Sequence, residues 1–320
     1  MPCYNEEEGI PFLRREVTAF LNEVPSPVEV ILVNDGSRDG TFRALYEWAR
    51  ADSRIKVLNL SRNFGHQIAA TAGLDYATGD AVVLMDADLQ DPLRIIHEML
   101  QRYREGFDVV YGRRAKRKAE SAFKRATAWL FYRLMRFLVY KDLPMDVGDF
   151  RLISRPCLDA LNQMREYHRF LRGMVTWIGF EQTEVLYERD PRRAGETKYP
   201  ISKMLKFAWT AATSFSSIPL NLSFVVGGIV GLFALEEAVR AIVAELQGYT
   251  VPGWTSLMVV TSLIGSVLLV FLGVLGQYVS RIYEQGKGRP LYIVSRAVNC
   301  EATNQADVLV ATGSRRSNDS

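Results

Sequence analysis

An acidic turn after a short apolar run carries the clearest chemistry in this chain. Residues 82–85 are apolar, and Asp86, Asp88, Gln90 and Asp91 follow them. The run predicts a buried strand, which places the acidic residues at its carboxyl end, where open α/β sheets bind ligands. Their oxygens suit Mg²⁺ or Mn²⁺, and such an ion in turn holds substrate phosphates. Aspartate is also frequent in turns and helix caps, so this motif alone leaves a purely structural role open.

Polar residues follow two other predicted strands. Tyr4, Asn5 and Glu6 follow the first, and Asp35 lies in an Asn-Asp-Gly-Ser sequence after the second. Such groups bind the ribose hydroxyls and base edge of a nucleotide, with glycine where the backbone must approach the ligand. The chain contains no Gly-x-Gly-x-x-Gly and no Gly-x-x-x-x-Gly-Lys-[Ser/Thr] sequence. A nucleotide bound here therefore has its phosphates held by metal and basic side chains.

Short apolar runs alternate with amphipathic segments around these motifs. We predict helices over residues 10–23, 41–51 and 65–76, and strands over residues 28–34, 55–61, the run before Asp86, and 109–112. This alternation is typical of the α/β class with a doubly wound, mostly parallel, Rossmann-like sheet.

The composition bounds the possible functions. With 320 residues the chain has room for one large α/β domain and a smaller region. A net charge of +3 is too small to indicate nucleic-acid binding, and the acidic amino-terminal residues show no signal-peptide pattern. The three cysteines are too widely spaced for a zinc site and favour a reducing compartment, where they serve as small apolar residues; they are Cys3, Cys157 and Cys300.

Four segments together resemble the signatures of family 2 glycosyltransferases. They are residues 2–7, 33–41, 61–65 and 86–92, and the resemblance extends to about residue 295. The most similar branch is the polyprenyl-phosphate sugar transferases, such as dolichol-phosphate mannose synthase and the GtrB-type bacterial glucosyltransferases. The resemblance implies a GT-A fold, a nucleotide-sugar donor and a divalent metal, Mg²⁺ or Mn²⁺. Family members carry a strand before Pro2 of which this chain contains only the end, so we expect a truncated first strand.

The resemblance also implies roles for individual residues. The expected metal ligands are Asp86, Asp88 and Gln90. The expected nucleotide-sugar contacts are Pro2, Tyr4, Asn5, Glu6, Asp35, Asn63, Asp86, Arg113, Arg192 and Lys198. Arg192 and Lys198 belong to a segment that matches the family's flexible arginine-glycine-lysine loop, which closes over the donor diphosphate. His66 follows the Asn-Phe-Gly turn and is a further candidate for contact with the donor.

A second acidic motif surrounds Asp149 and resembles the family's Gly-Asp-Phe-Arg-Leu segment, whose aspartate is the usual candidate for catalytic base. The expected catalytic residues are therefore Asp149, Asp88 and Arg151. A phosphate monoester acceptor has a second pKa of roughly 6 and is mostly dianionic at neutral pH, so it hardly needs a base. Asp149 then orients the acceptor or a metal-bound group instead. Arg151 pairs with Asp149 or with a phosphate, and a purely structural pair is the alternative.

The remaining segments point to a membrane. Residues 113–140 interleave basic and aromatic side chains, which is typical of an interfacial helix, with a core helix as the alternative. Apolar stretches predict a hairpin over residues 216–282 with spans at about 218–238 and 254–278, of which the second is the stronger prediction. Basic residues flank the hairpin while its loop is acidic, which places both termini in the cytoplasm. Its glycines permit a homo-oligomer without requiring one.

The predicted organisation has four parts. Residues 1–165 form the GT-A domain, 166–215 the active-site loop and juxtamembrane helices, 216–282 the hairpin, and 283–320 a cytoplasmic tail that is disordered after about 296.

The predicted function is inverting transfer of a hexose, with glucose favoured, from a UDP-sugar to polyprenyl (undecaprenyl) phosphate at the inner, cytoplasmic membrane of the cell. GDP-mannose is the alternative donor. A processive polysaccharide synthase is disfavoured because the chain lacks a Gln-x-x-Arg-Trp motif, and a non-catalytic sugar-nucleotide sensor because both acidic motifs are intact.

Overall fold

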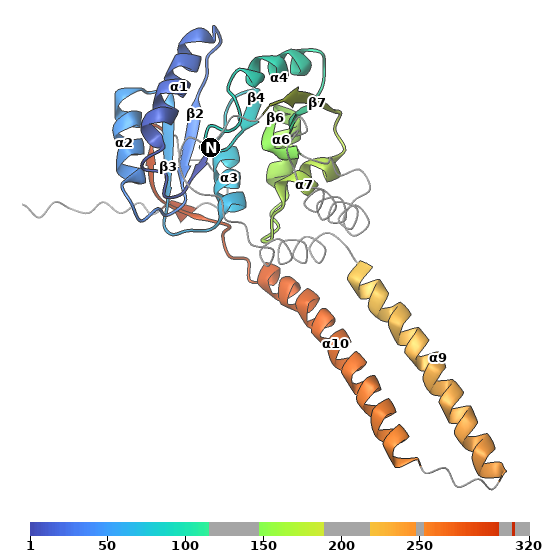
Figure 1. Ribbon diagram of the computed structural model, residues 1–320. Coiled ribbons are helices and arrows are strands. Elements are labelled where there is room, and N and C mark those ends of the chain that lie inside the picture. Colours follow the sequence, from blue (N-terminus) through green and yellow to red (C-terminus); the bar gives the residue numbers. More distant parts are fainter. Residues whose placement is uncertain (115–146, 189–217, 248–252, 301–308, 311–320) are drawn as a thin grey trace, which may run out of the picture. The chain divides into compact units, whose positions relative to one another are not determined.

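The computed structural model describes residues 1–114, 147–188, 218–247, 253–300 and 309–310 (Figure 1). The chain forms two compact units. The first comprises Met1–Trp129, Asp142–Lys198 and Arg289–Ser320, and the second comprises Leu130–Lys141 and Tyr199–Gly288.

The described part of the first unit alternates strands and helices. Its strands are β1 (Pro2–Cys3), β2 (Val30–Asn34), β3 (Ile55–Leu60), β4 (Ala81–Leu84), β5 (Val109–Arg114), β6 (Val147–Ser154), β7 (Gln182–Tyr187), β8 (Ile293–Val298) and β9 (Leu309–Val310). Its helices are α1 (Ile10–Glu23), α2 (Thr41–Ala51), α3 (His66–Asp75), α4 (Ile95–Arg104), α6 (Arg155–Gln163) and α7 (Leu171–Ile178). The helices predicted over residues 10–23 and 41–51 have these same bounds.

The strands form two sheets, with orders β1-β2-β3-β8-β9 and β4-β6-β5-β7. Strands β1, β2 and β3 are parallel because α1 and α2 cross over between them. β6 runs antiparallel to both β4 and β5, and β8 runs antiparallel to β3. The α/β class and the GT-A-like mixed arrangement are confirmed. The single mostly parallel sheet is replaced by two mixed sheets, because β6 and β8 run antiparallel to neighbouring strands.

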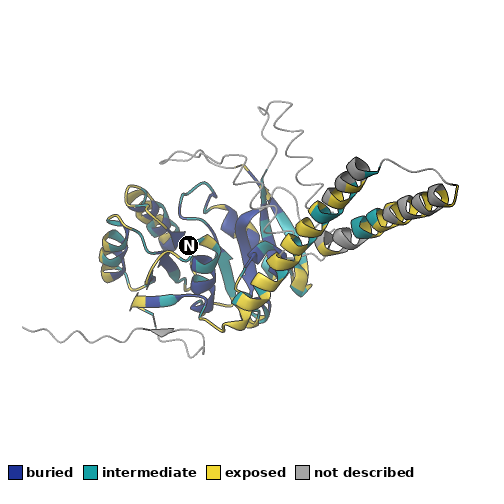
Figure 2. Ribbon diagram, turned by 90° about the horizontal axis from the view of Figure 1, so that it is seen from below, coloured by how far each residue is buried: buried dark blue, intermediate teal, exposed yellow. Residues whose placement is uncertain are grey.

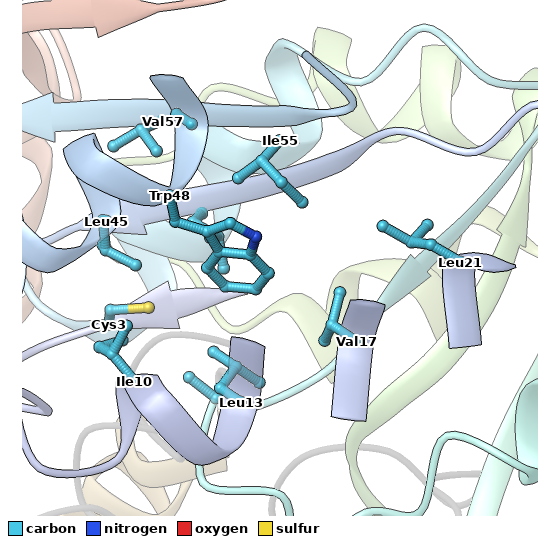
Figure 3. Packing of buried hydrophobic residues seen from close by; sticks show 12 residues of the cluster. Cys3, Ile10, Leu13, Val17, Leu21, Leu45, Trp48, Ile55 and Val57 are labelled. Carbon is cyan, nitrogen blue, oxygen red and sulfur yellow. The ribbon is translucent and has the colours of Figure 1, made fainter. Parts of the chain in front are cut away.

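One face of the first sheet packs against α1 and α2 (Figure 3). Ile10, Leu13, Val17 and Leu21 recur at helical spacing on α1 and are all buried. Trp48 of α2, which is 1% exposed, fills the space between them and β3. This cluster is the rigid base from which the loops after β1 and β2 project.

The same cluster contains Cys3, which is one of three free cysteines. Burial raises the pKa of its thiol to about 12, so it is a neutral packing group at physiological pH. The interpretation of this cysteine as a small apolar residue is consistent with that environment.

The segment that follows helix α10 (Trp254–Gly286) adds an unpredicted strand to the first sheet. We expected residues 283–320 to be a tail, but β8 pairs with β3 over Val57–Leu60. Tyr292 is fully buried, and its hydroxyl donates to Asp75 at 2.8 Å. Arg165 pairs with the same carboxylate at 2.9 Å. This part of the chain is therefore integral to the fold of the first unit.

The described part of the second unit consists of α9 (Ile218–Leu246) and α10 (Trp254–Gly286). Both predicted hairpin arms are thus helical, and apolar side chains are exposed along them (Figure 2). Among the described residues, one stretch, Leu263–Gly286, is long and apolar enough to cross a membrane, with a mean hydropathy of 2.0 and none of it buried.

Candidate active site

The loops after β1 and β2 hold one another in place. Asn5 has a left-handed backbone (φ 52°), and its side-chain oxygen accepts from the Arg38 amide at 2.9 Å. The Glu6 amide donates to the Thr41 hydroxyl at 2.9 Å. Tyr4 is 44% exposed beside them. The donor-binding residues predicted in these two loops therefore lie in one place, although Asn5 already uses its side chain to join the loops.

Asp35 organises the turn that contains Asn63. Its two carboxylate oxygens accept from the amides of Phe64 at 2.7 Å and Gly65 at 3.0 Å. Burial nevertheless raises the pKa of Asp35 above its ordinary value, with these amides opposing the shift. Gly36 has φ 64°, and a Cβ there would lie 2.3 Å from the carbonyl carbon of Arg62, so only glycine fits. In this structure Asp35 shapes the predicted donor site rather than presenting free oxygens to it.

The acidic turn after β4 holds aspartates in different environments. The Oδ1 atom of Asp86 is buried and accepts no hydrogen bond. Burial first, and then the charges of Asp149, Asp88 and Asp91, raise the pKa of Asp86, while His66 opposes them. By contrast, Asp91 is 1% exposed and accepts a short hydrogen bond from the Tyr187 hydroxyl. Asp91 therefore has a hydroxyl partner on β7, whereas Asp86 Oδ1 has His66 Nε2 at 3.4 Å.

These residues fit a divalent cation. Asp86, Asp88 and Gln90 offer oxygens on one turn, and the amide of Gln90 donates to Asp88 at 3.2 Å. Within the described ranges no group of three or more His, Cys, Asp or Glu side chains is arranged to hold a metal. A bound ion would therefore take further ligands from substrate phosphates or water, as Mg²⁺ commonly does. The orphaned oxygen of Asp86 is the feature that such an ion would satisfy.

Strain marks the same turn. Leu89, between Asp88 and Gln90, has a left-handed backbone with φ 55°. A bulky residue adopts this conformation at a cost of about 1–3 kcal/mol, and such strain is concentrated at ligand sites.

Asp149 has the opposite environment. Its Oδ1 accepts from Arg172 Nε at 2.7 Å, and its Oδ2 lies 3.2 Å from both His66 Nε2 and Gln67 Nε2. Burial opposes the charge, but the hydrogen bonds of His66 and Arg172 together outweigh it and hold the pKa of Asp149 well below its ordinary value. Asp149 is consequently a permanent, fully paired carboxylate.

The arginine expected beside Asp149 is not its partner. Arg151 is 4% exposed, and its Nη2 donates to the carbonyl of Gly148 at 3.1 Å. Burial lowers the pKa of Arg151 to about 10. Among the described residues Arg172 from α7, rather than Arg151, forms the ion pair with Asp149, and contact of Arg151 with a phosphate stays a prediction.

A similar change of partner occurs on β5. Arg113 forms an ion pair with Glu184 at 2.8 Å, with both side chains partly exposed. The next residue, Arg114, lies over Gly148, where an added Cβ would come within 2.8 Å of its Nη2. Burial lowers the pKa of Arg114, but its bond with Tyr187 and the charges of Asp91 and Asp86 raise it overall. Arg114 rather than Arg113 faces the acidic centre.

The sequence did not predict contacts to Asp149 from His66, Gln67 or Arg172. His66 lies 3.4 Å from Asp86 Oδ1 as well as 3.2 Å from Asp149, so it bridges the two acidic motifs. Gln67 donates to Asp149 and accepts from the Leu171 amide at 3.0 Å. Arg172 completes the set. The predicted turn at residues 61–65 pointed to His66, but no spacing pattern links α7 to Asp149.

Some predicted residues lie outside the described part of the chain. They are Arg192, Lys198 and all but the first two residues of the basic segment 113–140.

Comparison with known proteins identifies the family. The family model "Glycosyl transferase family 2" matches residues 1–161, which include both acidic motifs. The chain is 44% identical over 302 residues to the uncharacterized glycosyltransferase YkcC of Bacillus subtilis (strain 168), covering 94% of each. This chain belongs to glycosyl transferase family 2.

Two further relatives refine the comparison. The family 2 chain is 36% identical to the prophage bactoprenol glucosyl transferase homolog of Escherichia coli (strain K12), over 92% of this chain and 97% of that protein. It is 37% identical to the bactoprenol glucosyl transferase of Shigella phage SfV, over 92% of this chain and 96% of that protein. The chain is therefore a glycosyltransferase of the branch that sequence analysis indicated, and the similarity extends beyond the matched domain.

Proposed function

We propose that this glycosyltransferase moves glucose from UDP-glucose to a polyprenyl phosphate, with inversion at the anomeric carbon. Relatives named for bactoprenol glucosyl transfer, similar over more than nine-tenths of both chains, support this substrate pair. The structural observation that carries the proposal is that His66 contacts both acidic motifs. Asp86 has a buried oxygen that accepts no hydrogen bond, whereas both oxygens of Asp149 are paired.

The donor binds at the acidic turn after β4. Asp86, Asp88 and Gln90 hold Mg²⁺ or Mn²⁺, which supplies charge neutralisation for the departing nucleoside diphosphate. β1 and the loop after it contribute contacts to the nucleoside from Pro2, Tyr4, Asn5 and Glu6, and the turn after β3 contributes one from Asn63. Arg192 and Lys198 remain predicted contacts of the diphosphate.

The acceptor reacts beside Asp149. Its phosphate oxygen attacks the anomeric carbon while the bond from that carbon to the diphosphate oxygen breaks, and the electron pair leaves with the diphosphate. The acceptor phosphate is mostly dianionic at neutral pH, so no proton must be removed. Asp149, whose oxygens are all engaged, orients its neighbours instead of acting as general base.

The apolar helix explains how a lipid acceptor reaches this chemistry. Leu263–Gly286 spans the cytoplasmic membrane, and α9 supplies the second arm of a hairpin with both chain termini in the cytoplasm. Anchoring confines the enzyme to the surface that holds its acceptor, which raises the effective concentration of both.

Transfer assays with the purified full-length chain test the proposal. We expect label to move from UDP-[¹⁴C]glucose to citronellyl phosphate in the presence of Mn²⁺, with a β-linked product by NMR and no transfer in EDTA. GDP-mannose should be a poor donor. Transfer from GDP-mannose alone would replace the donor assignment, polymer formation would indicate a processive synthase, and nucleotide binding without any transfer would indicate a sensor.

A further inference from the structure

Arg172 presents an unused cationic edge beside Asp149. It is the second residue of α7, and its side chain is 36% exposed. Its Nε donates to Asp149 at 2.7 Å. No described residue accepts a hydrogen bond from its terminal Nη atoms, although a guanidinium carries four N–H groups there. Arg172 therefore retains N–H donors for a ligand, while the hydrogen bond from its Nε to Asp149 fixes the position of the guanidinium.

The surroundings hold this guanidinium in one orientation. Asp149 is anchored on its other oxygen by His66 and Gln67, each at 3.2 Å. Gln67 also accepts from the Leu171 amide, which fixes the start of α7 next to Arg172. A donor fork that is oriented before the ligand arrives loses less entropy on binding.

Arg172 lies close to the acidic turn after β4. His66 contacts both Asp86 of that turn and Asp149, the carboxylate to which Arg172 is bonded. The attacking phosphate carries about 1.5–2 negative charges and must approach opposite the leaving diphosphate. Asp149 alone would repel it, whereas a guanidinium that neutralises Asp149 and offers paired N–H donors attracts it.

The other arginine at Asp149 is not available for this role. Arg151 is 4% exposed and turned to the carbonyl of Gly148. Among the described residues bonded to Asp149, Arg172 is thus the cation that combines surface access with open donors.

We propose that Arg172 binds the phosphate group of the lipid acceptor, and that Asp149 serves to orient it. This inference rests on the proposed function and names the acceptor-binding side chain of that site. During transfer, Arg172 holds the non-attacking oxygens of the phosphate, and the attacking oxygen forms the new bond to the anomeric carbon as the bond to the diphosphate breaks.

Steady-state kinetics of Arg172→Ala and Arg172→Lys test the proposal in full-length protein. We expect R172A to raise KM for citronellyl phosphate by about tenfold or more, because hydrogen bonds to charged groups have that effect on affinity. KM for UDP-glucose should change less than about twofold, since uninvolved surface changes are that small. R172K should lie between R172A and wild type. Arg43→Ala, at a side chain 85% exposed on α2, is the matched control and should behave as wild type.

Equilibrium binding provides a second readout that needs no turnover. Citronellyl phosphate should bind wild type and be lost in R172A, while UDP with Mn²⁺ binds both equally and shows that the variant is folded. Citronellol should not compete, and inorganic phosphate should compete weakly, which separates the phosphate from the lipid chain.

The outcomes separate this inference from the proposed function. If wild type transfers glucose and R172A keeps its acceptor KM, or loses only kcat, Arg172 acts through Asp149 alone and the inference is overturned. Equal losses for donor and acceptor overturn it as well. If wild type uses no polyprenyl phosphate at all, the proposed function fails and this assignment fails with it.

Discussion

Asp86 and Asp149 are two aspartates that touch the same histidine, yet their environments are opposite. The Asp86 side chain is 30% exposed and its pKa is raised, mainly by burial, while the Asp149 side chain is 8% exposed and its pKa is lowered. Burial alone would reverse this order, because burial penalises the charged form of a carboxyl group. The hydrogen bonds of His66 and Arg172 decide the result at Asp149.

In the proposed function, this difference divides one reaction between two sites. At Asp86 the charges of Asp149, Asp88 and Asp91 oppose that of His66 and favour binding of a further cation. At Asp149 the cation is supplied by Arg172, which favours binding of an anion beside it. Similar side chains then serve a cation-binding centre in one place and an anion-binding centre in the other.

The largest effect should follow removal of a carboxylate from the cation-binding centre. Asp88→Ala should lower turnover by at least about 100-fold, since even residues that only support metal ligands alter activity by about 10–100-fold. Mn²⁺ should raise the thermal midpoint of wild type but not of the variant, because a ligand stabilises only a state that binds it. Asp159→Ala, at a surface side chain 59% exposed, is the control. Undiminished turnover in folded D88A would remove the basis for a metal at this turn.

Asp149→Asn should have the next largest effect, and the effect should not depend on pH. A lowered folded-state pKa keeps Asp149 charged above the unfolded-state pKa of about 3.9, and its stabilisation is lost only as pH falls through the still lower folded-state pKa. We therefore expect D149N to slow transfer by about 100-fold, as for loss of one preorganised catalytic contact, by the same factor at pH 5.5 and pH 8. Rate profiles of both proteins measure this. A ratio that shrinks at acidic pH would show that Asp149 titrates as a general base.

A smaller effect should follow loss of the bridge between the two centres. His66→Ala removes contacts to both Asp86 and Asp149 and should lower kcat by about tenfold, the effect of one hydrogen bond to a charged group. The H66A/D149N double variant should lose less than the product of the single effects, since the two side chains act as a unit. His97→Ala, at an exposed position on α4, is the matched control. Fully multiplicative losses would mean that the centres work independently.

The smallest effect on catalysis should follow loss of the hydrogen bond from Tyr292 to Asp75. Asp75 is a buried carboxylate that is also paired with Arg165. Tyr292→Phe removes one hydrogen bond to a charged group and should lower the unfolding free energy by about 2 kcal/mol. Both KM values should stay the same, because this cluster is structural. Thermal denaturation and transfer assays on the same preparation test this, and a changed acceptor KM would show that β8 communicates with the active site.

Local patterns were sufficient where the relevant contacts are close in sequence. Apolar spacing predicted the bounds of α1 and α2, because burial of Ile10, Leu13, Val17 and Leu21 needs no information beyond a helical period. Asp35 and Asp86 were identified because each lies at the end of a strand. Asp35 directly follows β2, and Asp86 is separated from β4 by Met85 alone. The sequence analysis did not predict β8, because its pairing with β3 joins residues that are far apart along the chain. Asn59 and Ser295, which share a hydrogen bond, are 236 positions apart.

The sequence by itself determined the family, the α/β class and the apolar C-terminal helices, and it singled out Asp86, Asp88 and Asp149 as candidates for the chemical centre. Only the tertiary structure decided the partners of those carboxylates. Arg172 replaces Arg151 at Asp149, Arg114 replaces Arg113 at the acidic centre, and His66 joins the two motifs. The reason is that charges interact through space and hydrogen bonds depend on direction. The partner of a buried carboxylate is therefore set by which helix and strand ends lie beside it in the fold. Residue spacing along the chain does not contain that information.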